Sequence, residues 1–243
     1  MPGIGLLNEK PLHASLKQWY ARPGDRFEVP VDGFVIDIVR DDLLIEIQTR
    51  NLAAINAKLS RLTRSRQVRL IYPIVKEKWI VHSGAIASSA LPTQRHRVRR
   101  DAANVVVRRK SPKRGRLEDV FFELVSIPQL LSNPNFSLEV LMVREEEVRR
   151  SDRRRRKGWV LERRHLLEVV DRHVFTKSED WLAFVPSGLN AFTTAELANG
   201  ISRELAQKLA YCLRHGKLIE LIGKQGRANL YRVADQLSVE EQN

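Results

Sequence analysis

The sequence predicts an α/β fold, with a central mixed sheet flanked by helices and a small domain after it. Short apolar runs of strand length alternate with helical patterns up to about residue 175, and the pattern then becomes compactly helical and ends in a hairpin. The composition, 43% hydrophobic and 29% charged, is enough for a packed core and unlike that of a disordered chain. A length of 243 residues accommodates two domains, which we place at 1–175 and 176–243.

The charge balance indicates a polyanionic partner. The formal net charge is +13, and nucleic acid is the commonest polyanion that such an excess binds. No apolar run approaches the roughly 20 residues that span a bilayer, and the first ten residues lack the pattern of a signal peptide. Cys212 is the single cysteine, which excludes an intramolecular disulfide and a cysteine-based zinc site. We therefore expect a cytoplasmic protein without a membrane partner.

The first predicted element is a helix over residues 8–20. Asn8 can cap it, and Leu12, Leu16 and Trp19 form its apolar stripe. Three polar residues recur beside that stripe at four-residue spacing: Glu9, His13 and Lys17. This polar stripe is either a solvated face or a face turned toward a site.

Strands and helices then alternate along the chain. "DRFEVPVDGFVIDIV", residues 25–39, predicts two strands joined at the "VDG" turn, and a turn at Asp41 and Asp42 leads into the strand "LLIEIQ". The basic stretch 93–116 predicts a hairpin or an exposed loop. The other predicted elements are a helix at 51–62, strands at 67–74 and 77–83, a helix at 117–131, a strand at 136–143, a loop at 149–158 and a strand at 165–175.

Two carboxylates interrupt apolar strands. Asp37 lies inside "GFVIDIV", and Glu46 lies inside "LLIEIQ". If the two strands pair antiparallel through the "RDD" turn, the two side chains come close together. Two unpaired carboxylates repel each other and are costly to desolvate, whereas a hard divalent cation such as Mg²⁺ or Mn²⁺ removes that penalty. The alternative is a structural ion pair with a nearby basic side chain.

The order of helix, hairpin, Asp37, Glu46-Ile47-Gln48, helix and strand resembles the PD-(D/E)XK, restriction-endonuclease-like nucleases. The resemblance covers residues 8 to about 82. It implies a central mixed sheet of that fold and a Mg²⁺ or Mn²⁺ ion held by Asp37, Glu46 and the carbonyl of Ile47. It also implies metal-dependent hydrolysis of DNA, in repair, recombination or defence.

The resemblance also implies roles for Gln48, Lys58 and Glu9, and the chain departs from the family pattern at Gln48. Gln48 stands where the family has a lysine that positions the attacking water, and Lys58 on the following helix is the candidate to supply that cation. Glu9 matches the first-helix acid that often completes the site. The departure at Gln48 keeps a rival open, a non-enzymatic DNA-binding protein or complex subunit with a degenerate nuclease fold.

The C-terminal segment resembles a winged helix-turn-helix. Thr193 and Glu196 form a capping box, and Ser202 can cap a second helix that ends at Gly216. "KLIELIG", the turn "KQGR" and "ANLYRVA" then predict a hairpin. The resemblance implies that the Ser202 helix enters a major groove and that the hairpin turn meets phosphate. The candidate DNA-binding residues are Ser202, Arg203, Gln207, Lys208, Arg214, Lys224 and Arg227.

Two basic runs complete the candidate interface. "RRKSPKRGR" and "RRSDRRRRKG" are either solvated loops or surfaces that follow a phosphate backbone. Neither reads sequence by itself. We expect DNA as the partner of a nucleoid-associated protein, and the sequence leaves a homodimer open.

Overall fold

The computed structural model describes residues 10–83, 97–101 and 104–234. For Ser83, 97–101 and 104–107 it describes the backbone alone. The chain forms two compact units, each assembled from three stretches of sequence. Unit 1 comprises Met1–Ala21, Pro73–Arg116 and Leu141–Arg172. Unit 2 comprises Arg22–Tyr72, Leu117–Val140 and His173–Asn243. The predicted domains, 1–175 and 176–243, are continuous stretches of sequence and stay a prediction.

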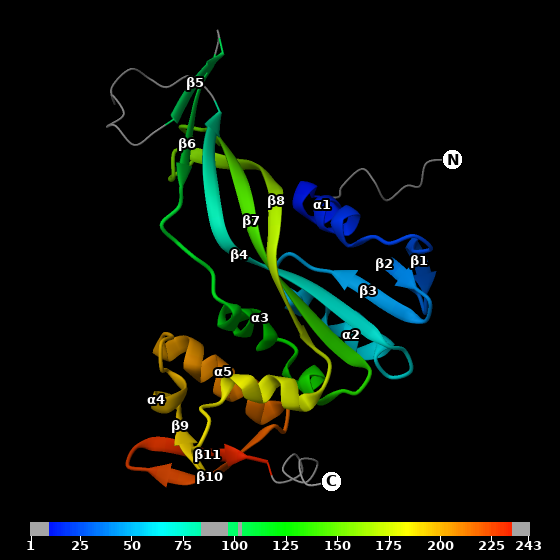
Figure 1. Ribbon diagram of the computed structural model, residues 1–243, viewed down its shortest axis with the longest axis vertical. Coiled ribbons are helices and arrows are strands. Elements are labelled where there is room, and N and C mark those ends of the chain that lie inside the picture. Colours follow the sequence, from blue (N-terminus) through cyan, green and yellow to red (C-terminus); the bar gives the residue numbers. More distant parts are fainter. Residues whose placement is uncertain (1–9, 84–96, 102–103, 235–243) are drawn as a thin grey trace. The chain divides into compact units, whose positions relative to one another are not determined.

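A large mixed sheet flanked by helices confirms the α/β class (Figure 1). Its strand order is β1-β2-β3-β4-β6-β5, and β7 pairs with both β4 and β8. A second sheet has the order β10-β11-β9. The strands of the large sheet are β1 (Arg26–Val31), β2 (Phe34–Arg40), β3 (Leu43–Ile47), β4 (Val68–Ser83), β5 (Arg97–Asp101), β6 (Asn104–Lys110), β7 (Phe136–Ser151) and β8 (Trp159–Phe175).

The helices are short. The α-helices are α1 (Pro11–Tyr20), α2 (Asn56–Leu62), α3 (Phe121–Leu124), α4 (Thr194–Leu197) and α5 (Arg203–His215). The 3-10 helices are η1 (Leu52–Ile55), η2 (Leu117–Val120), η3 (Pro128–Ser132) and η4 (Ser178–Phe184). The helix predicted at 117–131 is therefore three short helical pieces, and "SEDWLAF" forms a 3-10 helix.

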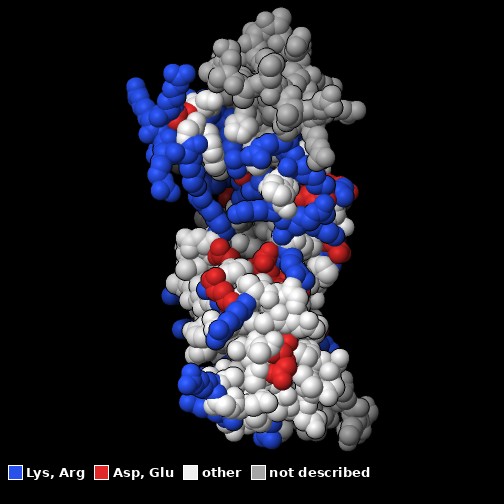
Figure 2. Space-filling view, turned by 90° about the vertical axis from the view of Figure 1, so that its left-hand side faces the viewer, with Lys and Arg blue, Asp and Glu red and all other residues white. Residues whose placement is uncertain are grey.

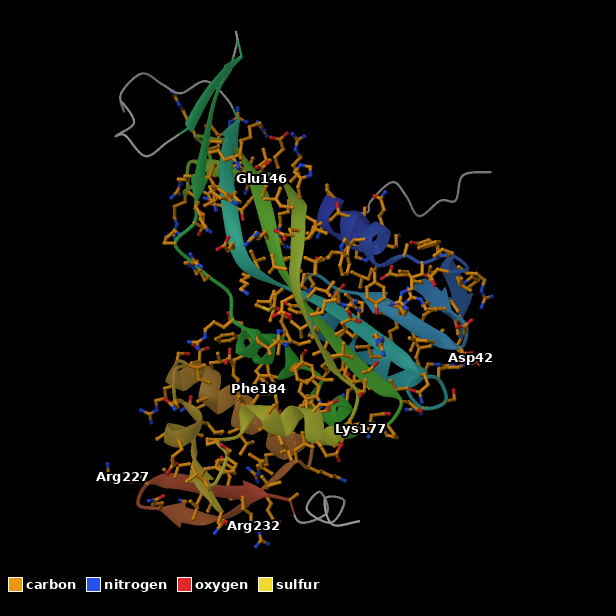
Figure 3. All side chains as sticks on the ribbon, viewed as in Figure 1. Asp42, Glu146, Lys177, Phe184, Arg227 and Arg232 are labelled. Atoms are coloured by element: carbon orange, nitrogen blue, oxygen red, sulfur yellow. The ribbon has the colours of Figure 1, made fainter. Side chains whose placement is uncertain are left out.

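Two tight turns set the register of the first three strands. β1 pairs with β2 so that Val31 faces Phe34, and the two intervening residues, Asp32 and Gly33, have φ angles of 50° and 84°. Such left-handed angles at both positions are typical of the two-residue turn whose twist matches that of a hairpin. The next turn at Asp41 and Asp42 (the latter labelled in Figure 3) pairs β2 antiparallel with β3.

One face of this three-stranded segment forms the core of unit 2. Ile36, Ile38, Ile45 and Ile47 alternate along β2 and β3, and each side chain is at most 2% exposed. Side chains alternate across a strand, so the opposite face carries Asp37 and Glu46. The register is therefore held by burial, because a slip of one residue would exchange the four isoleucines with the face that carries Asp37 and Glu46 and bring both acids into the isoleucine layer.

The structure joins the strands predicted at 67–74 and 77–83 into one, β4. Pro73 lacks the N–H that a sheet ladder needs. The pairing of β4 with β3 extends to Ile71, and the pairing with β6 begins at Trp79. Pro73 lies between the segments that pair with β3 and with β6, and the strand continues through it.

The first helix starts later than predicted, and its apolar stripe differs by one residue. Pro11 occupies the first turn of α1, and the predicted cap Asn8 lies outside the described residues. Leu12, Leu16 and Tyr20 are buried, whereas Trp19 is 44% exposed. The prediction of Trp19 as a core residue was wrong, because spacing of four residues from Leu16 selects Tyr20.

The C-terminal segment forms α4, α5 and the small sheet as the pattern predicted. Thr193 and Glu196 make the capping box of α4, and the Ser202 hydroxyl accepts a hydrogen bond from the Leu205 N–H at the start of α5. The strands are β9 (Phe192–Thr193), β10 (Ile219–Gln225) and β11 (Ala228–Val233). The buried residues of α5 lie along one face of the helix: Leu205, Ala206, Leu209, Ala210, Cys212 and Leu213.

An aromatic cluster ties this segment to the rest of unit 2. The Trp181 ring of η4 stacks on Phe175 at a centroid distance of 4.4 Å. Phe184, labelled in Figure 3, meets Phe121 of α3 edge-on at 4.9 Å. Edge-to-face and offset stacking are favourable geometries for buried rings, so helix η4 is fixed on α3.

Candidate functional site

Asp37 and Glu46 lie together on the polar face of β2 and β3. Ile38 pairs with Ile45 and Val39 pairs with Leu44, and the same register continued by one residue sets Asp37 opposite Glu46. Asp37 is half-buried and its Oδ2 accepts a hydrogen bond of 2.8 Å from the Ile47 N–H. The proximity that the "RDD" turn predicts is therefore present.

Glu46 is a buried acid with a strongly raised pKa. Its side chain lies in the core, at 5% residue exposure. Burial, and next the negative charge of Asp37, raise the pKa of Glu46 to about 7, although the nearby Lys58 ammonium opposes that rise. At neutral pH this carboxyl is divided between its protonated and ionised forms, so it can both give and take a proton.

Lys58 reaches the acid pair from α2. Its Nζ lies 2.6 Å from Glu46 Oε1 and donates a hydrogen bond of 2.6 Å to the carbonyl oxygen of Val35. The contact with Glu46 is a close ion pair that opposes the rise of the Glu46 pKa. The side chain of Lys58 is 16% exposed. The predicted helix lysine is thus held in place beside the acids.

The remaining predicted site residues are less closely joined to this pair. The Gln48 amide nitrogen donates to the carbonyl oxygen of Asn51 at 3.3 Å, so the side chain is engaged with the loop that follows β3. The N–H of Ile47 is taken by Asp37, and its carbonyl stays a predicted ligand. Glu9 lies outside the described residues.

The donor set fits a hard divalent cation. Two carboxylates on adjacent strand positions offer oxygen ligands of the kind that Mg²⁺ and Mn²⁺ prefer, although one of those oxygens, Glu46 Oε1, already meets the Lys58 ammonium at 2.6 Å. Across the described ranges, no three His, Cys, Asp or Glu side chains come together as a metal site. The predicted set consists of two acids and a main-chain carbonyl, so it would rely on water for its other ligands.

Two main-chain carbonyls around the site escaped prediction. Val35 O fixes the Lys58 ammonium, and Asn51 O holds the Gln48 amide. A carbonyl is present at every residue, so no sequence pattern distinguishes these two. Asn51 has a left-handed φ of 56°, a conformation that asparagine tolerates better than most residues. This preference of asparagine is the one feature of the local sequence that indicates a turn at this carbonyl.

The predicted DNA-binding residues lie on α5 and the β10–β11 hairpin of unit 2. Arg203, Gln207 and Arg214 are exposed on α5, and Ser202 is occupied as its cap. Lys208 is half-buried, and its Nζ lies 3.7 Å from Glu204 Oε1 and 5.6 Å from the centre of the Phe122 ring of α3.

The hairpin turn carries the other two candidates. Lys224 and Arg227 are exposed at the turn between β10 and β11, where Arg227 is labelled in Figure 3. Gly226 within the turn has a φ of 62°, which glycine adopts without strain. The hairpin therefore presents both cations to solvent.

Comparison with known proteins assigns a family to the chain. Residues 10–176 match the family model described as "Domain of unknown function (DUF8091)". The chain belongs to the DUF8091 family. An uncharacterized protein of Treponema pallidum (strain Nichols) is 27% identical over 237 residues, which cover 94% of this chain and 87% of that protein. No solved structure matches the chain.

The segment shared with the DUF8091 family contains the described residues of the candidate acid site. Asp37, Glu46, Gln48 and Lys58 all fall within residues 10–176, whereas α5 and the β10–β11 hairpin follow that segment. Among the described residues no helix is long and apolar enough to cross a membrane.

Proposed function

We propose that the chain is a metal-dependent nuclease that hydrolyses phosphodiester bonds of DNA. The observation that carries the proposal is the placement of Asp37 opposite Glu46, with the Lys58 ammonium 2.6 Å from Glu46 Oε1. Two acids and one cation on neighbouring elements supply what phosphodiester hydrolysis needs, a site for a divalent cation and a positive charge beside the phosphate.

The order and direction of the elements support this proposal. Helix α1 precedes the antiparallel strands β1, β2 and β3, and α2 then connects β3 to a parallel partner, β4. This is the order of helix, hairpin, acid-bearing strands, helix and strand on which the resemblance to restriction-endonuclease-like nucleases rests. Helix α5 and the β10–β11 hairpin similarly support a winged helix that binds DNA.

Each residue has a chemical role under the proposal. Asp37 and Glu46 would hold Mg²⁺ or Mn²⁺, which when bound polarises the phosphate and lowers the pKa of a water ligand. Lys58 would stabilise the negative charge that develops on the phosphate. Gln48 can donate a hydrogen bond to water but cannot take its proton.

A second candidate function rests on the same contacts. Lys58 already compensates Glu46, and the Ile47 N–H already compensates Asp37, so both acids are partnered by the protein itself. A DNA-binding subunit that retains the fold without hydrolysis would show this arrangement.

A cleavage assay separates the two functions. Duplex, branched and single-stranded DNA are incubated with the protein in Mg²⁺ and in Mn²⁺, beside the Asp37→Asn variant. The nuclease proposal predicts metal-dependent products with the wild-type protein and none with the variant. A wild-type protein that binds DNA and cleaves no substrate with either metal supports the non-enzymatic function.

A further inference from the structure

The positive charge of the chain is concentrated in unit 1. Its three stretches contain 25 Lys and Arg against 10 Asp and Glu, which leaves +15, whereas unit 2 contains 17 against 19, which leaves −2. Residues 173–243, which include α5 and the β10–β11 hairpin, contain eight of each sign. Figure 2 shows blue Lys and Arg side chains gathered over the part of the molecule that holds the ends of β4, β6 and β7. The long-range attraction for a polyanion therefore comes from unit 1.

The β7–β8 tip, defined as residues 152–158, "DRRRRKG", is an ordered turn. The Asp152 N–H donates to Gly158 O at 3.0 Å, and the Gly158 N–H donates to Arg155 O at 2.8 Å. The Asp152 carboxylate accepts a hydrogen bond of 3.0 Å from the Arg154 N–H. Gly158 closes the turn with a φ of 70°, which favours glycine. The basic run is thus displayed on a fixed turn of the backbone.

The acids at the base of the same hairpin are compensated by other cations. Lys78 Nζ lies 3.0 Å from Glu145 Oε1 and 2.7 Å from Glu147 Oε2. Arg164 and Arg149 pair with the other oxygens of these two acids, each at 2.5 Å. Because basic side chains pair with both oxygens of each acid, neither Glu145 nor Glu147 is available to pair with the cations of the β7–β8 tip.

Most cations of the β7–β8 tip consequently lack acidic partners. All five side chains from Arg153 to Lys157 are exposed, and the one ion pair there is a long contact of 4.0 Å between Arg155 and Asp152. In the described part of the chain, Arg153, Arg154 and Arg156 have no acidic side chain within ion-pair distance. Like charges held on one turn repel each other, an arrangement that an anionic partner would relieve.

We propose that the β7–β8 tip binds the phosphate backbone of duplex nucleic acid. Guanidinium groups match phosphate in a bidentate geometry, and a two-stranded ribbon is narrow enough for the major groove, about 12 Å wide. Single strands are bound by free aromatic faces on which bases stack. Trp159 beside the tip is covered by the Arg149 guanidinium, 3.7 Å from the ring centre. The tip also has no apolar side chain that could enter a bilayer.

This inference deepens the proposed function, because it rests on nucleic acid as the substrate and names the duplex as its form. Its test is a binding measurement in EDTA, so it does not depend on hydrolysis. The affinity of the full-length protein for a fluorescent 24-base-pair DNA duplex is measured from 50 to 200 mM salt. The variant is Arg154→Gln/Arg156→Gln, and the control is Arg61→Gln/Arg64→Gln, which removes the same charge from exposed positions of unit 2.

Loss of two phosphate contacts should lower the slope of log K against log salt by about 1.8. The tip variant should show this decrease, and the control should keep the wild-type slope. All four substituted side chains are exposed, so the thermal midpoint should stay unchanged. An unchanged slope in the tip variant, or a wild-type protein that does not bind duplex, overturns the inference.

Two further titrations distinguish duplex DNA from a single strand and from a membrane surface. A 24-base single strand and vesicles of phosphatidylserine are titrated with the same proteins. A decrease confined to the single strand or to the vesicles also overturns the duplex proposal. If the tip variant behaves as expected and the wild-type protein cleaves nothing, hydrolysis fails and the tip proposal stands. If the wild-type protein cleaves DNA and the slope is unchanged, the tip proposal alone fails.

Discussion

Glu46→Gln should make the protein more stable relative to wild type as the pH rises. The pKa of Glu46 is about 7 in the folded protein against 4.5 as its ordinary value. A raised pKa means that the folded state binds the proton more tightly than the unfolded state does. The stabilising effect of that proton is complete below the unfolded pKa and is lost as the pH rises through 7.

The magnitude follows from the size of the shift. One pKa unit corresponds to 1.36 kcal/mol, so full ionisation of Glu46 costs the folded protein about 3 kcal/mol. Most of this cost develops between pH 5 and pH 8, where the change is about 2.5 kcal/mol. Glutamine keeps the shape of the side chain and cannot ionise, so the variant escapes the cost. The lost ion pair with Lys58 offsets part of the gain but does not change its direction with pH.

Urea unfolding of both proteins at pH 5, 6, 7 and 8, in EDTA, measures the difference. Asp25→Asn is the matched control, because the hydrogen bond and charge of Arg40 hold the pKa of Asp25 below its ordinary 3.8. Both the folded and the unfolded pKa of that residue lie below pH 5, so the control difference should be flat over this range. If the Glu46→Gln difference is equally flat, Glu46 is not an acid destabilised by burial and by Asp37.

Three further predictions concern the site and the hairpin of the C-terminal segment. Lys58→Ala should lower the cleavage rate roughly 10²-fold or more, the scale of losing one electrostatic stabiliser, and an unchanged turnover rate would remove Lys58 from the mechanism. Gln48→Lys should leave cleavage equal or lower, because a second ammonium would repel Lys58, and a tenfold gain in rate would show that the site lacks a cation. Lys224→Ala/Arg227→Ala should decrease the salt slope of duplex binding by about 1.8, and an unaltered slope would mean that this hairpin does not contact DNA.

Local patterns in the sequence were sufficient to predict the framework of the site. The turn at Asp41 and Asp42 sets the pairing of two strands, and alternation then places Asp37 and Glu46 on one face. Lys58 could be predicted as the cation of the site because its helix, α2, closely follows those strands in sequence. The contact of 2.6 Å with Glu46 depends only on neighbouring elements.

Features that depend on distant parts of the chain were not predictable in this way. The sequence predicts two strands at 67–74 and 77–83, but the structure has the single strand β4, whose partners β3, β6 and β7 come from separate parts of the chain. Lys208 faces the Phe122 ring of α3, which is far away in sequence. The concentration of charge in unit 1 arises because that unit gathers three separate stretches, so a pass along the chain shows only scattered basic runs.

A calorimetric titration with Mn²⁺ at pH 8 tests most directly whether Asp37 and Glu46 form a divalent-cation site. The account predicts one binding event in the wild-type protein and none in Glu46→Gln. Because the pKa of Glu46 is about 7, repeating the titration at pH 6 should weaken binding about tenfold, as the ligand must first lose its proton. Equal heats for the wild-type protein and Glu46→Gln, or no Mn²⁺ binding by either, would contradict the account.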